Sequence, residues 1–329
     1  MEIRKAKTSD IENLFEFNAR IYPNKKIDSR KLINFWISKS RQATSDIVLF
    51  CDDNGKIVGQ VINSSTAYYF QNEKIDTVWG FDLIIEKKYR KDTWGIDLIL
   101  KNIEAHPRLM ATGSGPLAKS INLKLGMIDL GDIRKYVGII NPFWIFNSFW
   151  KGKISFNKFP SEITMKNKSF VLIDKSQIPT LNFPFNNNLL EIVRDKEFMQ
   201  WRFFNSFHDY AVYKDKDSNN YFILRTTIIK HITVMLLVDY RCNSQTSEQF
   251  ETILLAAKRI TSKLHLPILI TGSTLKTFDA VLEQHHFRSF GRPRPVLGFI
   301  KCKDRKEDID NRNFVFVTLA DSDGETNWI

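Results

Sequence analysis

The chain has 329 residues, of which 43% are hydrophobic and 26% are charged, and its net charge is +11. This length is too great for one simple core and fits two domains of about 150 residues each. The positive charge favours an acidic partner, such as nucleotide phosphates, RNA, anionic glycans or anionic lipid head groups, but the lysines and arginines are dispersed, which excludes a polybasic tail.

The first half of the chain alternates short apolar strands with amphipathic helices. Strands are predicted over residues 2–6, 46–51, 56–64, 77–85, 109–112 and 134–140. Helices are predicted over residues 11–17, 29–40, 91–105 and 117–125. The Asp-Asn-Gly sequence at 53–55 is typical of a tight hairpin turn and therefore joins two of these strands.

An aromatic connector at residues 143–150 leads to a second half with a similar plan. A helix is predicted over residues 194–204, and strands are predicted over residues 210–214, 221–227 and 231–239. The last segment, 313–329, contains one more apolar strand and a polar end.

The two halves share an internal repeat. In each copy an apolar strand leads to a Tyr-Arg pair, Tyr89-Arg90 or Tyr240-Arg241, which we expect to form a turn before a long helix. A short strand ending in Thr-Gly-Ser and a second helix follow, and the copies close at Gly131 and Gly291. A repeat of more than 60 residues indicates a duplicated domain and not a solenoid of small units. The start of the helix after the first turn offers unpaired N–H groups that suit an anion.

Cysteine usage and apolar stretches indicate where the protein resides. Cys51, Cys242 and Cys302 are widely spaced and odd in number, so they form neither a disulfide framework nor a zinc site. The first ten residues lack the apolar core of a signal peptide, and polar residues interrupt the apolar stretch at 136–156. We therefore expect a soluble, cytoplasmic protein with no membrane-spanning segment and no metal site.

The element order and the Tyr-Arg turn resemble the GNAT family of N-acyltransferases. Arg90 and Gly95 match the first and last positions of that family's main motif, with Thr93 at the place of a glycine. Ala118 and the pair Gly126-Met127 match a later signature. The resemblance covers residues 1 to about 140 well and recurs weakly over 166–302, where no glycine follows Arg241. It implies an α/β fold with two GNAT-like domains, each a mixed, mostly antiparallel sheet flanked by helices.

The resemblance also implies a binding site for acetyl-CoA or another acyl-CoA in the first copy. Backbone groups of Leu83, Ile84 and Ile85 would contact the pantetheine arm. The residues that would hold the pyrophosphate or lie beside it are Arg90, Lys91, Asp92, Thr93, Trp94, Gly95 and Ser114. An alternative interpretation of the same turn is a helix start capped by Asp92 that serves the fold alone.

Asp82 is the candidate catalytic residue because it is the only acid between Trp79 and Ile85. Strand alternation predicts that its side chain shares a face with Gly80 and Ile84. A partly buried carboxylate there could accept a proton from an attacking amine. The competing interpretation is a structural aspartate bound to neighbouring backbone. Asn122 stands where the family often has a tyrosine acid, and this leaves the protonation of the leaving thiolate open.

The predicted reaction is acyl transfer from a thioester to a primary amine of a small acceptor such as an amino sugar. One alternative is a different donor, an acyl carrier protein or an aminoacyl-tRNA, which the charge of +11 would suit. Another is a non-catalytic binding protein, which Thr93 and Asn122 favour. Binding of nucleic acid is not expected but remains open.

The repeat divides the chain into an N-terminal GNAT-like domain at 1–142, an aromatic connector at 143–160, a degenerate GNAT-like domain at 161–303 and a tail at 304–329. The connector contains five large aromatic residues, Phe143, Trp144, Phe146, Phe149 and Trp150. Because burial of each such side chain contributes roughly 1.5–3 kcal/mol, we expect the connector to be packed between the domains. The second domain would then shape the acceptor pocket.

Overall fold

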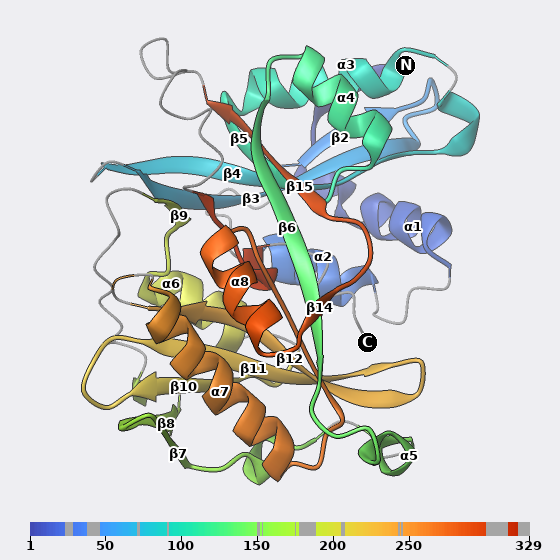
Figure 1. Ribbon diagram of the computed structural model, residues 1–329. Helices are drawn as coiled ribbons and strands as arrows, with labels where there is room; N and C mark the ends of the chain where they lie inside the picture. The colour runs from blue at the N-terminus through green and yellow to red at the C-terminus, as the bar shows by residue number, and fades with distance from the viewer. Residues whose placement is uncertain are drawn as a thin grey trace. The chain divides into compact units, whose positions relative to one another are not determined.

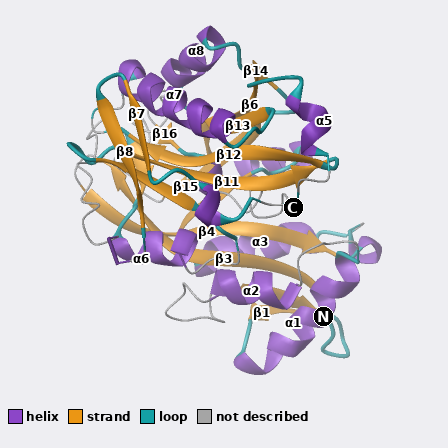
Figure 2. Ribbon diagram, turned by 90° about the horizontal axis from the view of Figure 1, so that it is seen from below, coloured by secondary structure: helices purple, strands orange, loops and turns teal. Residues whose placement is uncertain are grey.

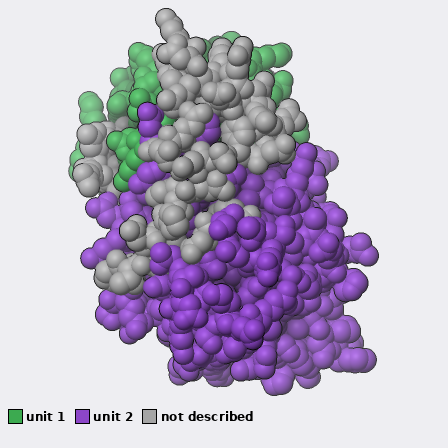
Figure 3. Space-filling model, turned by 60° about the vertical axis from the view of Figure 1, so that its left-hand side comes forward, with its two compact units in different colours: residues 1–68, 74–131, 295–312 green, residues 69–73, 132–294, 313–329 purple. Residues whose placement is uncertain are grey.

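The computed structural model has a mixed α/β fold, as predicted. It describes residues 1–23, 29–37, 47–70, 73–90, 92–149, 152, 154–174, 176–177, 189–204, 208–242, 244, 246–300 and 315–321. The chain forms two compact units (Figure 3). Unit 1 contains residues 1–68, 74–131 and 295–312, and unit 2 contains residues 69–73, 132–294 and 313–329. None of the helices in the described part of the chain has the length and apolar character that a membrane crossing requires.

Unit 1 is a sheet with helices on both faces. Its strands, in sheet order, are β1 Glu2–Lys5, β2 Ile47–Cys51, β3 Ile57–Phe70, β4 Glu73–Ile85, β5 Arg108–Thr112 and β15 Arg294–Ile300. Its helices are α1 Ile11–Ile21, α2 Ser29–Ile37, α3 Trp94–Ala105 and α4 Pro116–Lys124. β4 and β5 are parallel, and the pairs β1–β2, β2–β3 and β5–β15 are antiparallel. Helices α3 and α4 cover one face of this sheet, and α1 and α2 cover the other (Figure 1).

Helix α3 is held on the sheet by its apolar side. Leu98 packs with Phe50 and Ile85, and Ile99 packs with Val78 and Leu109 in a second cluster. The buried apolar residues of α3, Leu98, Ile99 and Ile103, form one stripe that faces the strands. The stripe fixes where the first turn of α3 lies against the end of β4.

Unit 2 contains a second sheet, covered by the long helix α7 and by α8 (Figure 2). Its sheet order is β6 Ile128–Ile139, β13 Ile268–Ser273, β12 Ile232–Arg241, β11 Tyr221–Ile229, β10 Ala211–Asp215, β8 Lys168–Ile173 and β7 Glu162–Met165. The short strands are β9 Leu190–Ile192, β14 Arg288–Ser289 and β16 Val315–Phe316. The helices are α5 Trp144–Ser148, α6 Lys196–Met199, α7 Ser247–Lys263 and α8 Lys276–Gln284.

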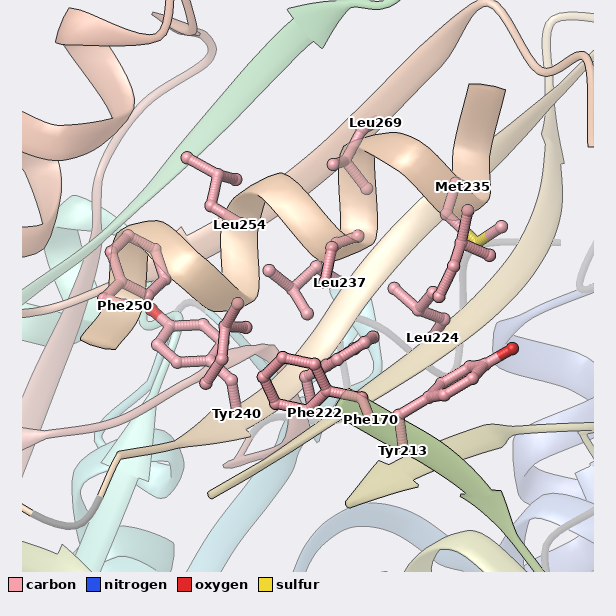
Figure 4. Packing of buried hydrophobic residues seen from close by; sticks show 14 of the residues in the cluster. Phe170, Tyr213, Phe222, Leu224, Met235, Leu237, Tyr240, Phe250, Leu254 and Leu269 are labelled. Carbon is pink, nitrogen blue, oxygen red and sulfur yellow. The ribbon is translucent and has the colours of Figure 1, made fainter. Parts of the chain in front are cut away.

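Helix α7 anchors the core of unit 2. Thr246 caps it, because its side-chain oxygen accepts a hydrogen bond from the Gln249 N–H at 3.3 Å. Its buried face carries Phe250 and Leu254, which lie over Tyr240, Phe222 and other strand residues (Figure 4). This core is larger than the two clusters described for unit 1.

The closing strand of each repeat lies in the sheet of the other repeat. β6 follows α4 in sequence, yet its residues from Arg134 to Ile139 pair antiparallel with β13 in unit 2. β15 follows α8, yet its residues from Val296 to Ile300 pair antiparallel with β5 in unit 1. The compact units therefore place residues 132–139 of β6 in unit 2 and residues 295–300 of β15 in unit 1.

The aromatic connector differs from its prediction. Phe143 and Phe146 are 80% and 81% exposed, so the expectation that the connector buries its large aromatic side chains is wrong for these two residues. Trp144 lies edge-on to His265 at 5.0 Å between ring centroids, and Phe149 forms a β-bridge with Ile232. Because α5 has a single turn, Phe143 and Phe146 share one face and cannot turn inward together with Trp144. Trp150 lies outside the described residues.

The placement of β6 can be tested at Gly138. A Cβ atom there would lie 2.4 Å from Cζ of the buried Phe287. We therefore expect Gly138→Ala to destabilise the protein by about 1–3 kcal/mol through overpacking, measured by denaturant unfolding. Gly115→Ala is the matched control because nothing lies within 4 Å of its Cβ position. Equal stability of the two variants would contradict the packing of β6 against Phe287.

Candidate active site

Strand β4 parts from β5 immediately before Asp82. The two strands pair at Val78↔Leu109, Trp79↔Met110 and Gly80↔Ala111, and the described pairing ends there. Asp82 has φ of 53°, in the left-handed region that non-glycine residues rarely adopt. A left-handed residue inside a strand marks a bulge and strain, and such features concentrate near functional sites.

The bulge changes the face that successive side chains occupy. A Cβ atom on Gly80 would lie 2.9 Å from Leu109, which packs under α3. Val78 and Ile85 also pack on the α3 side, although they are seven positions apart. A regular strand would place these two on opposite faces. The prediction that Asp82 shares a face with Gly80 is therefore wrong, because the left-handed residue turns its side chain towards α1.

Two side chains hold the carboxylate of Asp82. The Tyr22 hydroxyl donates to Oδ1 at 2.5 Å, and the Gln60 amide donates from Nε2 to Oδ2 at 2.8 Å. Asn18 of α1 in turn donates from Nδ2 to Gln60 Oε1 at 2.7 Å. Gln60 and Asn18 are almost fully buried. The partners of Asp82 are thus side chains, whereas the structural interpretation from sequence named neighbouring backbone.

Sequence reasoning missed Tyr22, Gln60 and Asn18. Their signal was weak but present: Asn18 lies on the apolar side of a helix, and Gln60 interrupts the apolar strand 57–62. A buried amide needs a hydrogen-bond partner, so two such residues on facing elements indicate a polar link through the core. This link ends at Asp82, which is half-buried and retains lone pairs on both oxygens for a further donor.

The turn after β4 brings the start of α3 close to the end of the bulged segment. Arg90 donates from Nε to the carbonyl of Ile85 at 2.8 Å, which closes the turn. Ile96 and Asp97 donate the first backbone hydrogen bonds of α3, both to the Thr93 carbonyl. The N–H groups of Trp94 and Gly95 precede this ladder, at the positive end of the helix dipole. Lys91 lies outside the described residues.

The side chains around this turn have defined partners. The Thr93 hydroxyl donates to the Asp97 carboxylate at 3.0 Å, and Thr93, not Asp92, is the helix-cap residue. The Trp94 indole stacks on Phe50 with ring centroids 4.9 Å apart. A Cβ on Gly95 would meet only Ile85, at 3.7 Å. The large side chain of Trp94 therefore packs against the core of unit 1.

The remaining predicted site residues lie on the same unit. Leu83 is 38% exposed, Ile84 is half-buried and Ile85 is buried in the α3 cluster. Ser114 is half-exposed in the turn between β5 and α4. Asn122 is buried on α4. Its side-chain amide cannot act as a general acid.

The second repeat does not reproduce this geometry. Tyr240 and Arg241 lie within β12 and are buried, so the predicted second Tyr-Arg turn is a strand. Arg241 forms a buried ion pair with Glu191. No residue of β12 has a positive φ in the described chain. The described pairing of β12 with β13 ends at Leu236 and the β11–β12 register skips Val238, but the residues of β12 from Thr233 to Arg241 are buried, so this stretch belongs to the core.

The backbone at Asp82 can be tested with two substitutions that both remove the carboxylate. Glycine adopts φ near 53° freely, whereas alanine pays about 1–2 kcal/mol there. We expect Asp82→Gly to be more stable than Asp82→Ala by about 1 kcal/mol in urea unfolding. In a regular strand the order reverses, because glycine weakens strands relative to alanine, so an alanine variant of higher stability would contradict the bulge.

Structural comparison identifies proteins with a similar fold. No protein-family model matches the sequence, and no curated protein matches it. A GCN5-related N-acetyltransferase from Anabaena variabilis aligns with a TM-score of 0.58 and 12% identity, over 90% of this chain and 72% of that one. N-myristoyltransferase from Saccharomyces cerevisiae, solved with bound myristoyl-CoA, aligns with a TM-score of 0.59 and 12% identity, over 95% of this chain and 88% of that one.

A third solved structure, described as a probable N-acyltransferase from Enterococcus faecalis, aligns with a TM-score of 0.59 and 11% identity, over 90% of this chain and 72% of that one. At these identities the likeness concerns the fold. The chain thus has the fold of the GCN5-related N-acetyltransferases, which confirms the resemblance drawn from its sequence.

Proposed function

We propose that this protein is an N-acyltransferase that moves an acyl group from an acyl-CoA to a primary amine. The observation that carries the proposal is the left-handed residue Asp82 near the end of β4, followed by the turn at Lys87–Tyr89 and the start of α3 at Trp94. The fold is one in which a solved neighbour carries myristoyl-CoA. In the second repeat, β12 also has a register shift, at Val238, but its residues have no positive φ, they are buried, and the Tyr-Arg pair forms no turn; we therefore assign the proposed donor site to unit 1 alone.

The donor would bind along the released edge of β4. The described pairing of β4 with β5 ends at Gly80, so the amides of a pantetheine arm would meet the backbone of Leu83, Ile84 and Ile85, where the Ile85 carbonyl already accepts from Arg90. The pyrophosphate would lie at the N–H groups of α3, among Arg90, Lys91, Asp92, Thr93, Trp94 and Gly95, with Ser114 at the neighbouring turn. Residues 86–97 carry one net positive charge, which favours a phosphate only mildly.

The proposed chemistry is direct attack. The amine nitrogen forms a bond to the thioester carbonyl carbon, the carbon–sulfur bond breaks, and the thiolate departs. Asp82 accepts the proton that the nitrogen loses, while Tyr22 and Gln60 hold its carboxylate in place. An alkyl thiol has a pKa of about 8.5, so its thiolate can leave without an acid at Asn122.

Acetyl-CoA is the donor we propose first, with a small amine such as an amino sugar as the acceptor. The likeness to N-myristoyltransferase makes a long-chain acyl-CoA the second donor to test.

Donor binding can be tested at Thr93, which is exposed and precedes α3. Thr93→Glu places a negative charge at the proposed phosphate position, and Thr93→Gln has the same shape without the charge. We expect isothermal titration with CoA, acetyl-CoA and myristoyl-CoA to give one site per chain. The Glu variant should bind at least about tenfold more weakly than the Gln variant. Equal affinity of the two variants would place the phosphate elsewhere.

The role of Asp82 can be tested with Asp82→Asn. Asparagine tolerates left-handed φ and keeps the shape, but it cannot accept a proton. We expect kcat to fall by about 10²-fold or more at neutral pH, with donor affinity unchanged. Asp76→Asn, an exposed substitution on the same strand, is the control. Full activity of Asp82→Asn would show that Asp82 only supports the strand.

A further inference from the structure

The surface around α5 combines exposed aromatic groups with positive charge. Phe143 and Phe146 are exposed by four-fifths, and Ile139, at the end of β6, is 63% exposed. Soluble proteins rarely leave two neighbouring phenylalanines this open without a partner. All three residues belong to unit 2, and Figure 1 shows α5 at the periphery, beyond the end of β6.

Two turns of unit 2 meet α5 and bring basic residues to it. The turn between β11 and β12 holds Lys230 and His231, next to Ile232, which bridges to Phe149. Helix α7 ends at Lys263, and the turn that leads to β13 holds His265, whose ring lies against Trp144. All four basic residues are exposed. We define the α5 surface as Ile139, Phe143, Phe146, Lys230, His231, Lys263 and His265.

The segments that form the α5 surface lack acidic residues. No Asp or Glu occurs over residues 133–161, 221–238 or 252–278, which contain the connector and both turns. The segment 133–161 alone contains five lysines and arginines. The chain has 37 acidic residues, but none lies in these three segments. The region around α5 is therefore positively charged, and the exposed side chains of Phe143 and Phe146 are its apolar part.

We propose that the α5 surface docks on the surface of an anionic lipid bilayer. Phenylalanine side chains on a protruding single turn can enter the head-group region, while the lysines beside them remain among lipid phosphates. The charge complementarity decides between occupants. A second copy of this chain would bring the same cations into contact with each other, and a neutral apolar partner would leave the flanking lysines unused.

The experiment is co-sedimentation of the full-length protein with vesicles of phosphatidylcholine containing phosphatidylglycerol, and with vesicles of pure phosphatidylcholine. We expect binding to the anionic vesicles, weaker binding to the neutral ones, and release by added salt. The double variant Phe143→Ser, Phe146→Ser should lower the partition coefficient by at least about tenfold. Leu117→Ser is the control, because Leu117 is 75% exposed on α4 of unit 1.

A second variant tests the charges independently of the aromatic residues. Lys230→Glu with Lys263→Glu should reduce binding to anionic vesicles by at least about tenfold and remove its salt dependence. Either of two results would overturn the proposal: absence of binding to anionic vesicles, or unchanged binding by both double variants. A wild-type dimer that the phenylalanine variant converts to a monomer, without vesicle binding, would identify the surface as a self-association interface.

Discussion

The candidate site depends on one backbone constraint, the left-handed conformation of Asp82. This residue shifts the alternation of β4, so that Val78 and Ile85, seven positions apart, both pack under α3 while the Asp82 carboxylate faces α1. Aspartate tolerates that conformation better than most side chains, and the amide link from Asn18 through Gln60 secures it. The same shift ends the pairing with β5 and leaves the following edge of β4 available. One residue thus determines both the proposed base and the proposed donor groove.

The two copies of the predicted repeat differ in structure at the Tyr-Arg pair. In the second repeat the Tyr-Arg pair is part of a buried strand, and its arginine is paired with Glu191. Nearby, Arg194 contacts Asp239 and Asp321 in the same core. Buried charges need such partners, because an isolated one costs several kcal/mol. The positions that could recognise an anion in unit 1 therefore serve the stability of unit 2.

The sequence predicted the fold and the main strands and helices of the first half, because periodicity and the Arg90 and Gly95 signature are local signals, but it did not predict α5, β7, β8 or β9. It could not predict the exchange of β6 and β15. Both strands have the same local pattern in either sheet, and only pairing between distant residues selects their place. The face of Asp82 was missed because alternation assumes regular dihedral angles. The connector was misjudged because composition does not say which side of a single helical turn Phe143 occupies.

The central claim is that the donor binds at the bulged end of β4 and the start of α3. Hydrogen exchange of the full-length protein with and without acyl-CoA measures this directly, at the level of peptide segments. We expect the donor to protect backbone amides over residues 83–85 and 92–96 and to leave residues 237–250 unchanged. Protection confined to residues 237–250, or no protection of residues 83–85 and 92–96 at saturating donor, would contradict the account.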